Sequence, residues 1–177
     1  ALIRVKGIGL AIRAFEQFNK WHDDTEFVIV GSGPEEPRLR SLVRQRELEG
    51  KVQFVPAMPH HILLSEMAGC DVFLFPSLRD GGGAVVIEAM AMGTPVVCLD
   101  TGGPAMHVNS KCGIKVLVDS PAQAATALAE AMGDLYDDPA LKMRQGTEAV
   151  KRVRAFYQWD RLGERLMGIY DQVLLAD

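Results

Sequence analysis

Short apolar runs alternate with amphipathic stretches between residues 7 and 118. The runs are rich in β-branched and aromatic residues and are apolar almost throughout, which is typical of strands covered on both faces of a parallel sheet. The stretches between them carry apolar residues at helical spacing. The pattern therefore predicts the α/β class with a doubly wound parallel sheet. The expected strands cover residues 26–33, 52–55, 71–76, 95–100 and 113–118, and the expected helices cover residues 7–19, 34–48, 60–70 and 84–93.

The first predicted helix begins almost at the start of the chain. Apolar residues recur at offsets of three and four, which places them on one helical face. Only ALIRV and Lys6 precede this helix. An α/β sheet usually has a strand in front of its first helix. We therefore expect the first strand of the sheet to be truncated or missing.

Beyond residue 121 the strand pattern does not return. Three helices are predicted in succession, over residues 121–138, 139–157 and 158–175. The last of them has an apolar stripe that needs a surface to pack on, either its own sheet or a partner. The stripe consists of Leu162, Leu166, Ile169, Tyr170 and Val173.

Composition supports one folded unit of ordinary size. Of the 177 residues, 48% are apolar, which is enough to bury a core, so we expect a single domain over residues 1–177. The net charge of −4 argues against nucleic-acid binding by charge alone, since such domains usually carry a basic excess. No apolar run approaches the roughly 20 residues of a membrane span, and charges interrupt the N-terminal residues where a signal peptide is apolar. We therefore expect a cytoplasmic protein.

The loop after the third predicted strand has the composition of a ligand-binding loop. In open parallel sheets, ligands bind beyond the carboxyl ends of the strands. Here FPSLRDGGG leaves the sheet and enters a helix whose free N–H groups favour an anion. Glycines let a phosphate approach the backbone closely, so the loop suits a nucleotide or a sugar phosphate. The alternative is a flexible turn in which Asp80 caps the helix.

Glu88 lies inside the helix that follows this loop. It is flanked by the apolar stretches AVVI and AMAM. A carboxylate in such surroundings must be paired or hydrogen-bonded, and ribose hydroxyls are suitable donors. The alternative is an ordinary helical glutamate that faces solvent.

Several stretches of the chain together resemble one enzyme family. FPSLRDGGGAVVIEAMAMGTPVV is similar to the signature of the family 4 retaining glycosyltransferases of GT-B fold, in which two acids flank seven residues. KGIGLAIRAF, FVIVGSGPEEPRL, VQFVP and WDRLGERLMGIY resemble, in order, that family's first helix, its strand and glycine turn, its nucleobase loop and its closing helix. The resemblance implies the donor-binding, C-terminal half of a GT-B enzyme, with a Rossmann-like sheet.

The resemblance also implies a role for each candidate residue. Glu88 takes the place of the acid that holds the ribose, Asp80 that of the acid that contacts the transferred sugar, and Lys6 that of the lysine that neutralises the diphosphate. Without the resemblance, Lys6 is an ordinary solvated lysine. The other implied donor-binding positions are Gly81, Gly82 and Gly83 for the sugar and phosphates, Phe54 and Val55 for the base through main-chain groups, and Gly31 and Gly33 beneath the nucleotide or, alternatively, in a plain tight turn.

The function implied for the intact protein is transfer of a hexose from a nucleoside diphosphate sugar to a glycan or lipid acceptor. The family needs no metal or other cofactor for this step. We expect the acceptor-binding N-terminal domain and its histidine to be absent from this chain, so the chain alone would bind donor but be inactive. The helix over residues 158–175 would cross to that domain, and peripheral membrane contact of the full-length enzyme is compatible with the family. The chain's own histidines have no ligand spacing, so surface or core roles are expected for His22, His60, His61 and His107.

Three features depart from the family pattern. Asp80 replaces the usual glutamate and is one methylene shorter, and the GGG that follows it lacks the family's aromatic residue. The arginine that helps Lys6 bind diphosphate should lie about five residues earlier, where this chain begins with Ala1. We therefore expect weakened diphosphate binding.

Two other functions are alternatives to the donor-binding domain. A dinucleotide-binding oxidoreductase domain fails because GSGPEE does not match GxGxxG. A non-catalytic module that binds a sugar nucleotide or a partner without turnover stays open.

Overall fold

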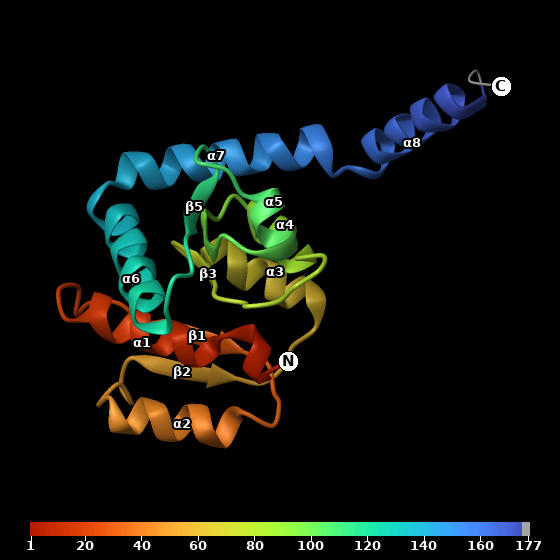
Figure 1. The fold of residues 1–177 in the computed structure, drawn as a ribbon. Helices are drawn as coiled ribbons and strands as arrows, with labels where there is room; N and C mark the ends of the chain where they lie inside the picture. Colours follow the sequence, from red (N-terminus) through yellow and green to blue (C-terminus); the bar gives the residue numbers. More distant parts are fainter. Residues whose placement is uncertain (175–177) are drawn as a thin grey trace.

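The computed structural model describes residues 1–174 and has the predicted alternation of strands and helices (Figure 1). The strands are β1 (Phe27–Val30), β2 (Val52–Val55), β3 (Phe73–Phe75), β4 (Val96–Leu99) and β5 (Gly113–Val116). The helices are α1 (Ile8–Asn19), α2 (Glu36–Gln45), α3 (His60–Gly69), α4 (Ala84–Ala91), α5 (Gly102–His107), α6 (Pro121–Asp137), α7 (Pro139–Phe156) and α8 (Trp159–Leu174). A short 3-10 turn covers Arg4–Lys6.

All strand pairs are parallel, which confirms the α/β class. Hydrogen bonds join the strands into two sheets, β1–β2 and β3–β4–β5. In the second sheet Val97 lies opposite Leu74 of β3 and Ile114 of β5. Because parallel strands end at the same edge, the loops after β3, β4 and β5 are neighbours at the carboxyl edge of this sheet.

Helices cover both faces of the β3–β4–β5 sheet, as a doubly wound fold requires. All residues of β4 are buried. Val97 and Leu99 belong to one core cluster with residues of α1 and α6, whereas Val96 and Cys98 belong to another with residues of α3, α4 and α7. The continuous apolar run in this strand thus reflects two cores, one on each face.

The N-terminal residues bridge the two sheets. The N–H of Leu2 donates to the carbonyl of Ser32 after β1 (2.9 Å), and the carbonyl of Val5 accepts from the N–H of Leu78 after β3 (2.9 Å). The Leu2 side chain is buried in the core beside α1. Within the described part of the chain a 3-10 turn, and no strand, precedes α1.

Two helices need comment. The sequence pattern did not predict α5, a helix of six residues that starts at a Gly-Gly pair. Helix α8 was predicted over residues 158–175, begins at Trp159 and extends away from the rest of the molecule (Figure 1), while position 175 lies outside the described residues. None of its residues is buried, so its apolar stripe has no cover in this structure. Among residues 1–174, no helix has the length and apolar character needed to cross a bilayer.

Candidate functional site

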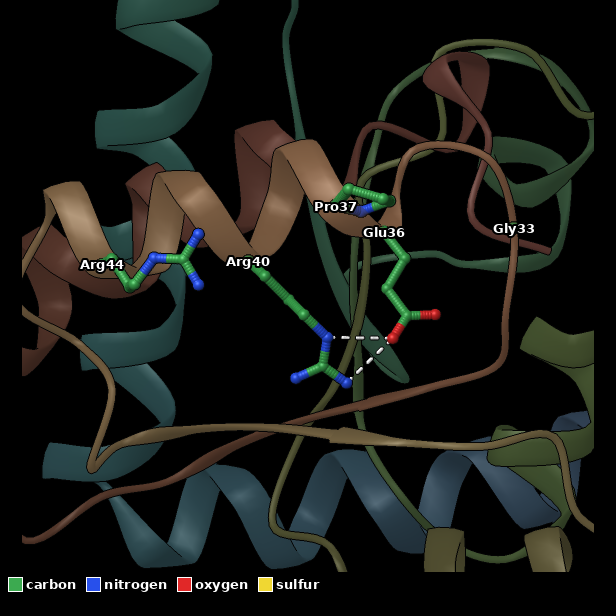
Figure 2. Close-up of a pocket in the computed structure, with 5 residues that line it drawn as sticks. All are labelled: Gly33, Glu36, Pro37, Arg40 and Arg44. Carbon is green, nitrogen blue, oxygen red and sulfur yellow. Dashed lines mark hydrogen bonds and ion pairs between the residues drawn. The ribbon is translucent and has the colours of Figure 1, made fainter.

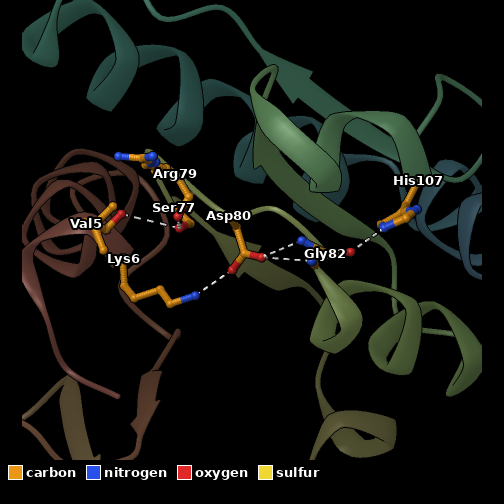
Figure 3. Close-up of polar contacts among 8 residues, drawn as sticks. Val5, Lys6, Ser77, Arg79, Asp80, Gly82 and His107 are labelled. Carbon is orange, nitrogen blue, oxygen red and sulfur yellow. Dashed lines mark hydrogen bonds and ion pairs between the residues drawn. The ribbon is translucent and has the colours of Figure 1, made fainter.

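The side chain of Lys6 contacts that of Asp80, which lies in the loop that follows β3 (Figure 3). The Lys6 ammonium nitrogen lies 2.5 Å from Oδ2 of Asp80, although 74 residues separate the two in sequence. The contact depends on the N-terminal segment, because the Val5 carbonyl accepts the Leu78 N–H and fixes Lys6 beside this loop. The backbone hydrogen bond between Val5 and Leu78 thus brings Lys6 within reach of Asp80.

The Asp80 carboxylate also organises its own loop. Its Oδ1 accepts hydrogen bonds from the N–H groups of Gly82 (3.2 Å) and Gly83 (2.8 Å). The hydrogen bond from Lys6, followed by that from the Gly83 N–H, lowers the pKa of Asp80 below its ordinary value. Asp80 is not the residue that begins the helix, since Gly83 is the N-cap of α4 and has a left-handed backbone (φ +60°). Asp80 instead holds the glycine loop just ahead of the helix.

The glycine loop rests on a second pair of glycines at the start of α5. The Gly103 N–H donates to the carbonyl of Asp80 at 2.9 Å. A Cβ on Gly103 would lie 2.4 Å from the Gly81 carbonyl oxygen, and one on Gly102 would lie 2.6 Å from that of Asp80. Only glycine allows this approach of the two backbones. On the outer side, a Cβ on Gly81 or Gly82 would meet no atom within 4 Å, so the loop is open on that side.

Glu88 lies one turn further along α4 than the exposed residue Ala84, and on the same side of the helix. Its side chain is 33% exposed, and its Oε1 lies 3.2 Å from Nε2 of His60. His60 is the first residue of α3, so it belongs to the connection that follows β2. Glu88 is therefore half-buried and faces the loop after β2, where the base was predicted to bind.

Most of the other residues predicted to contact the nucleotide already contact other parts of the chain. The Val55 carbonyl accepts the N–H of Gly31 at 2.9 Å. The Phe54 ring lies under the Arg40 guanidinium, 4.5 Å from its centroid. A Cβ on Gly33 would lie 2.4 Å from the Leu2 carbonyl oxygen, so Gly33 makes room for the N-terminal segment. Gly31 has φ +126°, and a Cβ placed on it would meet no atom within 4 Å.

A cavity of about 510 Å³ lies along α2 rather than between the two acids (Figure 2). It is lined by Gly33, Glu36, Pro37, Arg40 and Arg44. Arg40 pairs with Glu36 at 2.8 Å, which satisfies part of its charge. Of the predicted site residues this cavity includes Gly33 alone, and neither Asp80 nor Glu88 lines it.

Two residues near the site were missed by sequence reasoning. His60 pairs with Glu88, and His107 contacts the glycine loop through the Gly82 carbonyl. His60 could have been found from its position, since it follows the carboxyl end of a predicted strand. His107 gave no such signal because α5 was not predicted. Residues 1–174 contain no cluster of three His, Cys, Asp or Glu side chains that could hold a metal ion.

The fold and the acid–glycine loop define an α/β protein with a glycine loop at the carboxyl edge of a parallel sheet, and comparison with known proteins gives the family. The family model described as "Glycosyl transferases group 1" matches residues 1–152, so the chain belongs to this family. Alpha-D-kanosaminyltransferase from Streptomyces kanamyceticus is 30% identical over 169 residues, which is 95% of this chain and 43% of the relative. The chain thus spans less than half the length of that relative.

Solved structures agree with this assignment. Sucrose-phosphate synthase from Thermosynechococcus elongatus has 29% identity and a TM-score of 0.82, covering 99% of this chain and 44% of that one. Anabaena Alr3699/HepE, solved in complex with UDP and glucose, has 21% identity and a TM-score of 0.82, covering 96% of this chain and 46% of that one. At this identity the second likeness concerns the fold alone. The predicted GT-B glycosyltransferase fold is confirmed.

Proposed function

We propose that this chain is the donor-binding half of a retaining glycosyltransferase that moves a hexose from a nucleoside diphosphate sugar to a glycan or lipid acceptor. The observation that carries the proposal is the Lys6–Asp80 pair beside a glycine loop with an open outer side. An ammonium group binds phosphate, a carboxylate accepts sugar hydroxyls, and glycines let both approach the backbone. UDP and glucose bound to a protein of the same fold support this choice of ligand.

The Lys6–Asp80 pair has capacity left for a ligand. An ammonium group has three N–H donors, and one of them is used by Asp80. A carboxylate has about four acceptor sites, and Lys6, Gly82 and Gly83 occupy three of them. Lys6 would donate its other N–H groups to the diphosphate, while Asp80 would accept one sugar hydroxyl.

Charge explains what the pair would do during transfer. Negative charge develops on the diphosphate as the glycosidic bond breaks, and fixed donors that face it lower the barrier. Lys6 would supply a positive charge, and the N-terminal end of α4 would supply partial positive charge behind the glycine loop. No side chain is assigned as a nucleophile, and no metal or other cofactor is expected.

Glu88 would bind the ribose of the donor. Its carboxylate is half-buried on α4 and is paired with a His60 side chain that is 64% exposed. A polar contact with so exposed a partner is weak, so ribose hydroxyls can replace it at little cost. Main-chain groups around Phe54 and Val55 would contact the base from the adjacent loop.

Helix α8 would connect this half to an acceptor-binding N-terminal domain. Its exposed apolar side chains include Leu166, Ile169 and Tyr170, and none of its residues is buried. We expect the chain by itself to bind donor without transferring sugar, because the acceptor site would belong to the other domain. Peripheral membrane contact of the full-length enzyme belongs to the same proposal.

Calorimetric titration of the chain with UDP-glucose and GDP-mannose tests the donor site. We expect weak but measurable heat with one of them, lost in Glu88→Ala. Glu49→Ala is the matched control, because Glu49 is exposed and precedes β2 at the opposite edge of its sheet. The absence of heat with either nucleotide, in a chain shown to be folded, would overturn the proposal.

A further inference from the structure

His107 holds the glycine loop from the side opposite to Asp80 (Figure 3). Its Nε2 lies 2.6 Å from the Gly82 carbonyl oxygen. Its Nδ1 lies 2.9 Å from the hydroxyl of Tyr157, and the two rings meet edge to face with centroids 5.1 Å apart. His107 therefore joins the loop to the end of α7, where Tyr157 is the C-cap.

These contacts fix one peptide plane at both ends. The carbonyl of Gly82 and the N–H of Gly83 belong to the same peptide group and point in opposite directions. His107 binds the carbonyl, and Asp80 Oδ1 accepts the N–H at 2.8 Å. A peptide between two glycines is otherwise free to rotate over many conformations. The two side chains together select one of them.

The surroundings of His107 determine how it binds. A carbonyl oxygen only accepts, so Nε2 must carry a proton, and in the neutral ring Nδ1 then accepts from the Tyr157 hydroxyl. Arg152 holds the backbone at this point, since its guanidinium donates to the carbonyls of His107 (2.7 Å) and Met106 (3.2 Å). These carbonyls close α5 and have no partner within the helix. The ring is thus positioned from α7 by both its side chain and its backbone.

We propose that His107 is a positioning residue for sugar-nucleotide binding, which it promotes by fixing the Gly82–Gly83 peptide under the sugar and phosphates of the donor. The inference rests on the proposed donor site. It follows that His107 matters for the part of the donor that lies on the glycine loop. Its two ring nitrogens contact Gly82 and Tyr157, whereas Glu88 is paired with His60, so His107 should leave binding of the nucleoside part unaffected.

Three variants of the chain separate positioning from general packing. His107→Leu removes both ring nitrogens, His107→Gln keeps an N–H that can reach the Gly82 carbonyl, and Tyr157→Phe removes only the hydroxyl. We expect His107→Leu to shift the backbone amide resonances of Gly82 and Gly83 and to lower their heteronuclear NOE. His107→Gln should restore them, and Tyr157→Phe should change them less. Tyr157→Phe also keeps the test open if the leucine variant does not fold.

The same variants are then titrated with the sugar nucleotide that the wild type binds and with the matching nucleoside monophosphate. We expect His107→Leu to lower the affinity for the sugar nucleotide about three- to tenfold, as the loss of one hydrogen bond would. The affinity for the monophosphate should change less than about twofold. Unchanged amide resonances, an equal loss for both ligands, or a glutamine variant no better than leucine would overturn the proposal. If the wild type binds no nucleotide, the donor site itself fails, while the amide resonances still decide whether His107 fixes the loop.

Discussion

The two acids that flank the glycine loop are held in different ways. Asp80 accepts hydrogen bonds from Lys6, Gly82 and Gly83, and its side chain is 16% exposed. Glu88 is 33% exposed and pairs with a histidine that is itself mostly exposed. The region around Asp80 is therefore organised before any ligand arrives, whereas Glu88 is only loosely engaged.

This difference separates two kinds of contribution. Asp80 serves the structure of its loop as well as any ligand, so its loss changes both. Glu88 contributes little to structure, because ion pairs with exposed partners are worth about 0–1 kcal/mol. A substitution at Glu88 therefore reports on binding more directly than one at Asp80.

The largest expected effect comes from the glycines that support the Asp80 loop. Gly103→Ala places a Cβ against the Gly81 carbonyl, and we expect the free energy of unfolding to fall by about 1–3 kcal/mol, as for other overpacked sites. Gly81→Ala points into open space and should change it by less than about 0.5 kcal/mol. Urea denaturation of both variants measures the difference. Equal stability of the two variants would contradict the tight packing of the loop on α5.

A smaller effect is expected when Asp80 loses its cation. Lys6→Met should raise the pKa of Asp80 toward its ordinary value of 3.8 and lower the free energy of unfolding at pH 7 by about 1 kcal/mol. The folded-state pKa is lowered, so this stabilisation is present above the unfolded pKa and is lost as the pH falls through the folded value.

The pH dependence supplies the check on this prediction. The stability difference between wild type and Lys6→Met should be constant near neutral pH and shrink below about pH 4. Lys20→Met, at an exposed lysine at the end of α1, is the control and should show no such dependence. A difference that grows on acidification would show that the ion pair does not stabilise the fold.

The smallest effect is expected at the partner of Glu88. His60→Ala should change the free energy of unfolding by less than about 0.5 kcal/mol, because the His60 side chain is mostly exposed. The same substitution should change the affinity for the nucleotide by less than about threefold. Any change should be toward tighter binding, because His60 no longer competes with the ribose for Glu88. Thermal denaturation and calorimetry measure both quantities. A tenfold loss of affinity would indicate that His60 itself contacts the nucleotide.

The sequence predicted the regular elements well because their signals are local. Apolar runs such as VQFV and PVVCLD became strands, and the stripe of Ile8, Ala11, Ile12 and Phe15 became α1. Helix α5 was missed because Gly102, Gly103 and Pro104 are poor helix formers, and its conformation depends on packing against the glycine loop. Local propensity carries no information about such a contact.

The candidate site was predictable as a set of residues but not as a geometry. The resemblance placed Lys6, Asp80 and Glu88 in one site, yet their partners come from distant segments. The Lys6–Asp80 contact depends on a backbone bond between Val5 and Leu78, and the Glu88–His60 contact depends on how α3 packs on α4. Such pairs follow from tertiary structure, which is also why His60 and His107 were not expected near the site.

One pair of isosteric variants tests the central claim most directly. Asp80→Asn and Glu88→Gln are each titrated with the sugar nucleotide that the wild type binds and with its nucleoside monophosphate. If Asp80 binds the sugar and Glu88 the ribose, Glu88→Gln should lower the affinity for both ligands by a similar factor of about ten. Asp80→Asn should lower the affinity for the sugar nucleotide alone. The account would be contradicted by a folded Asp80→Asn variant whose affinity for both ligands falls equally, or by a Glu88→Gln variant whose affinity for neither ligand falls.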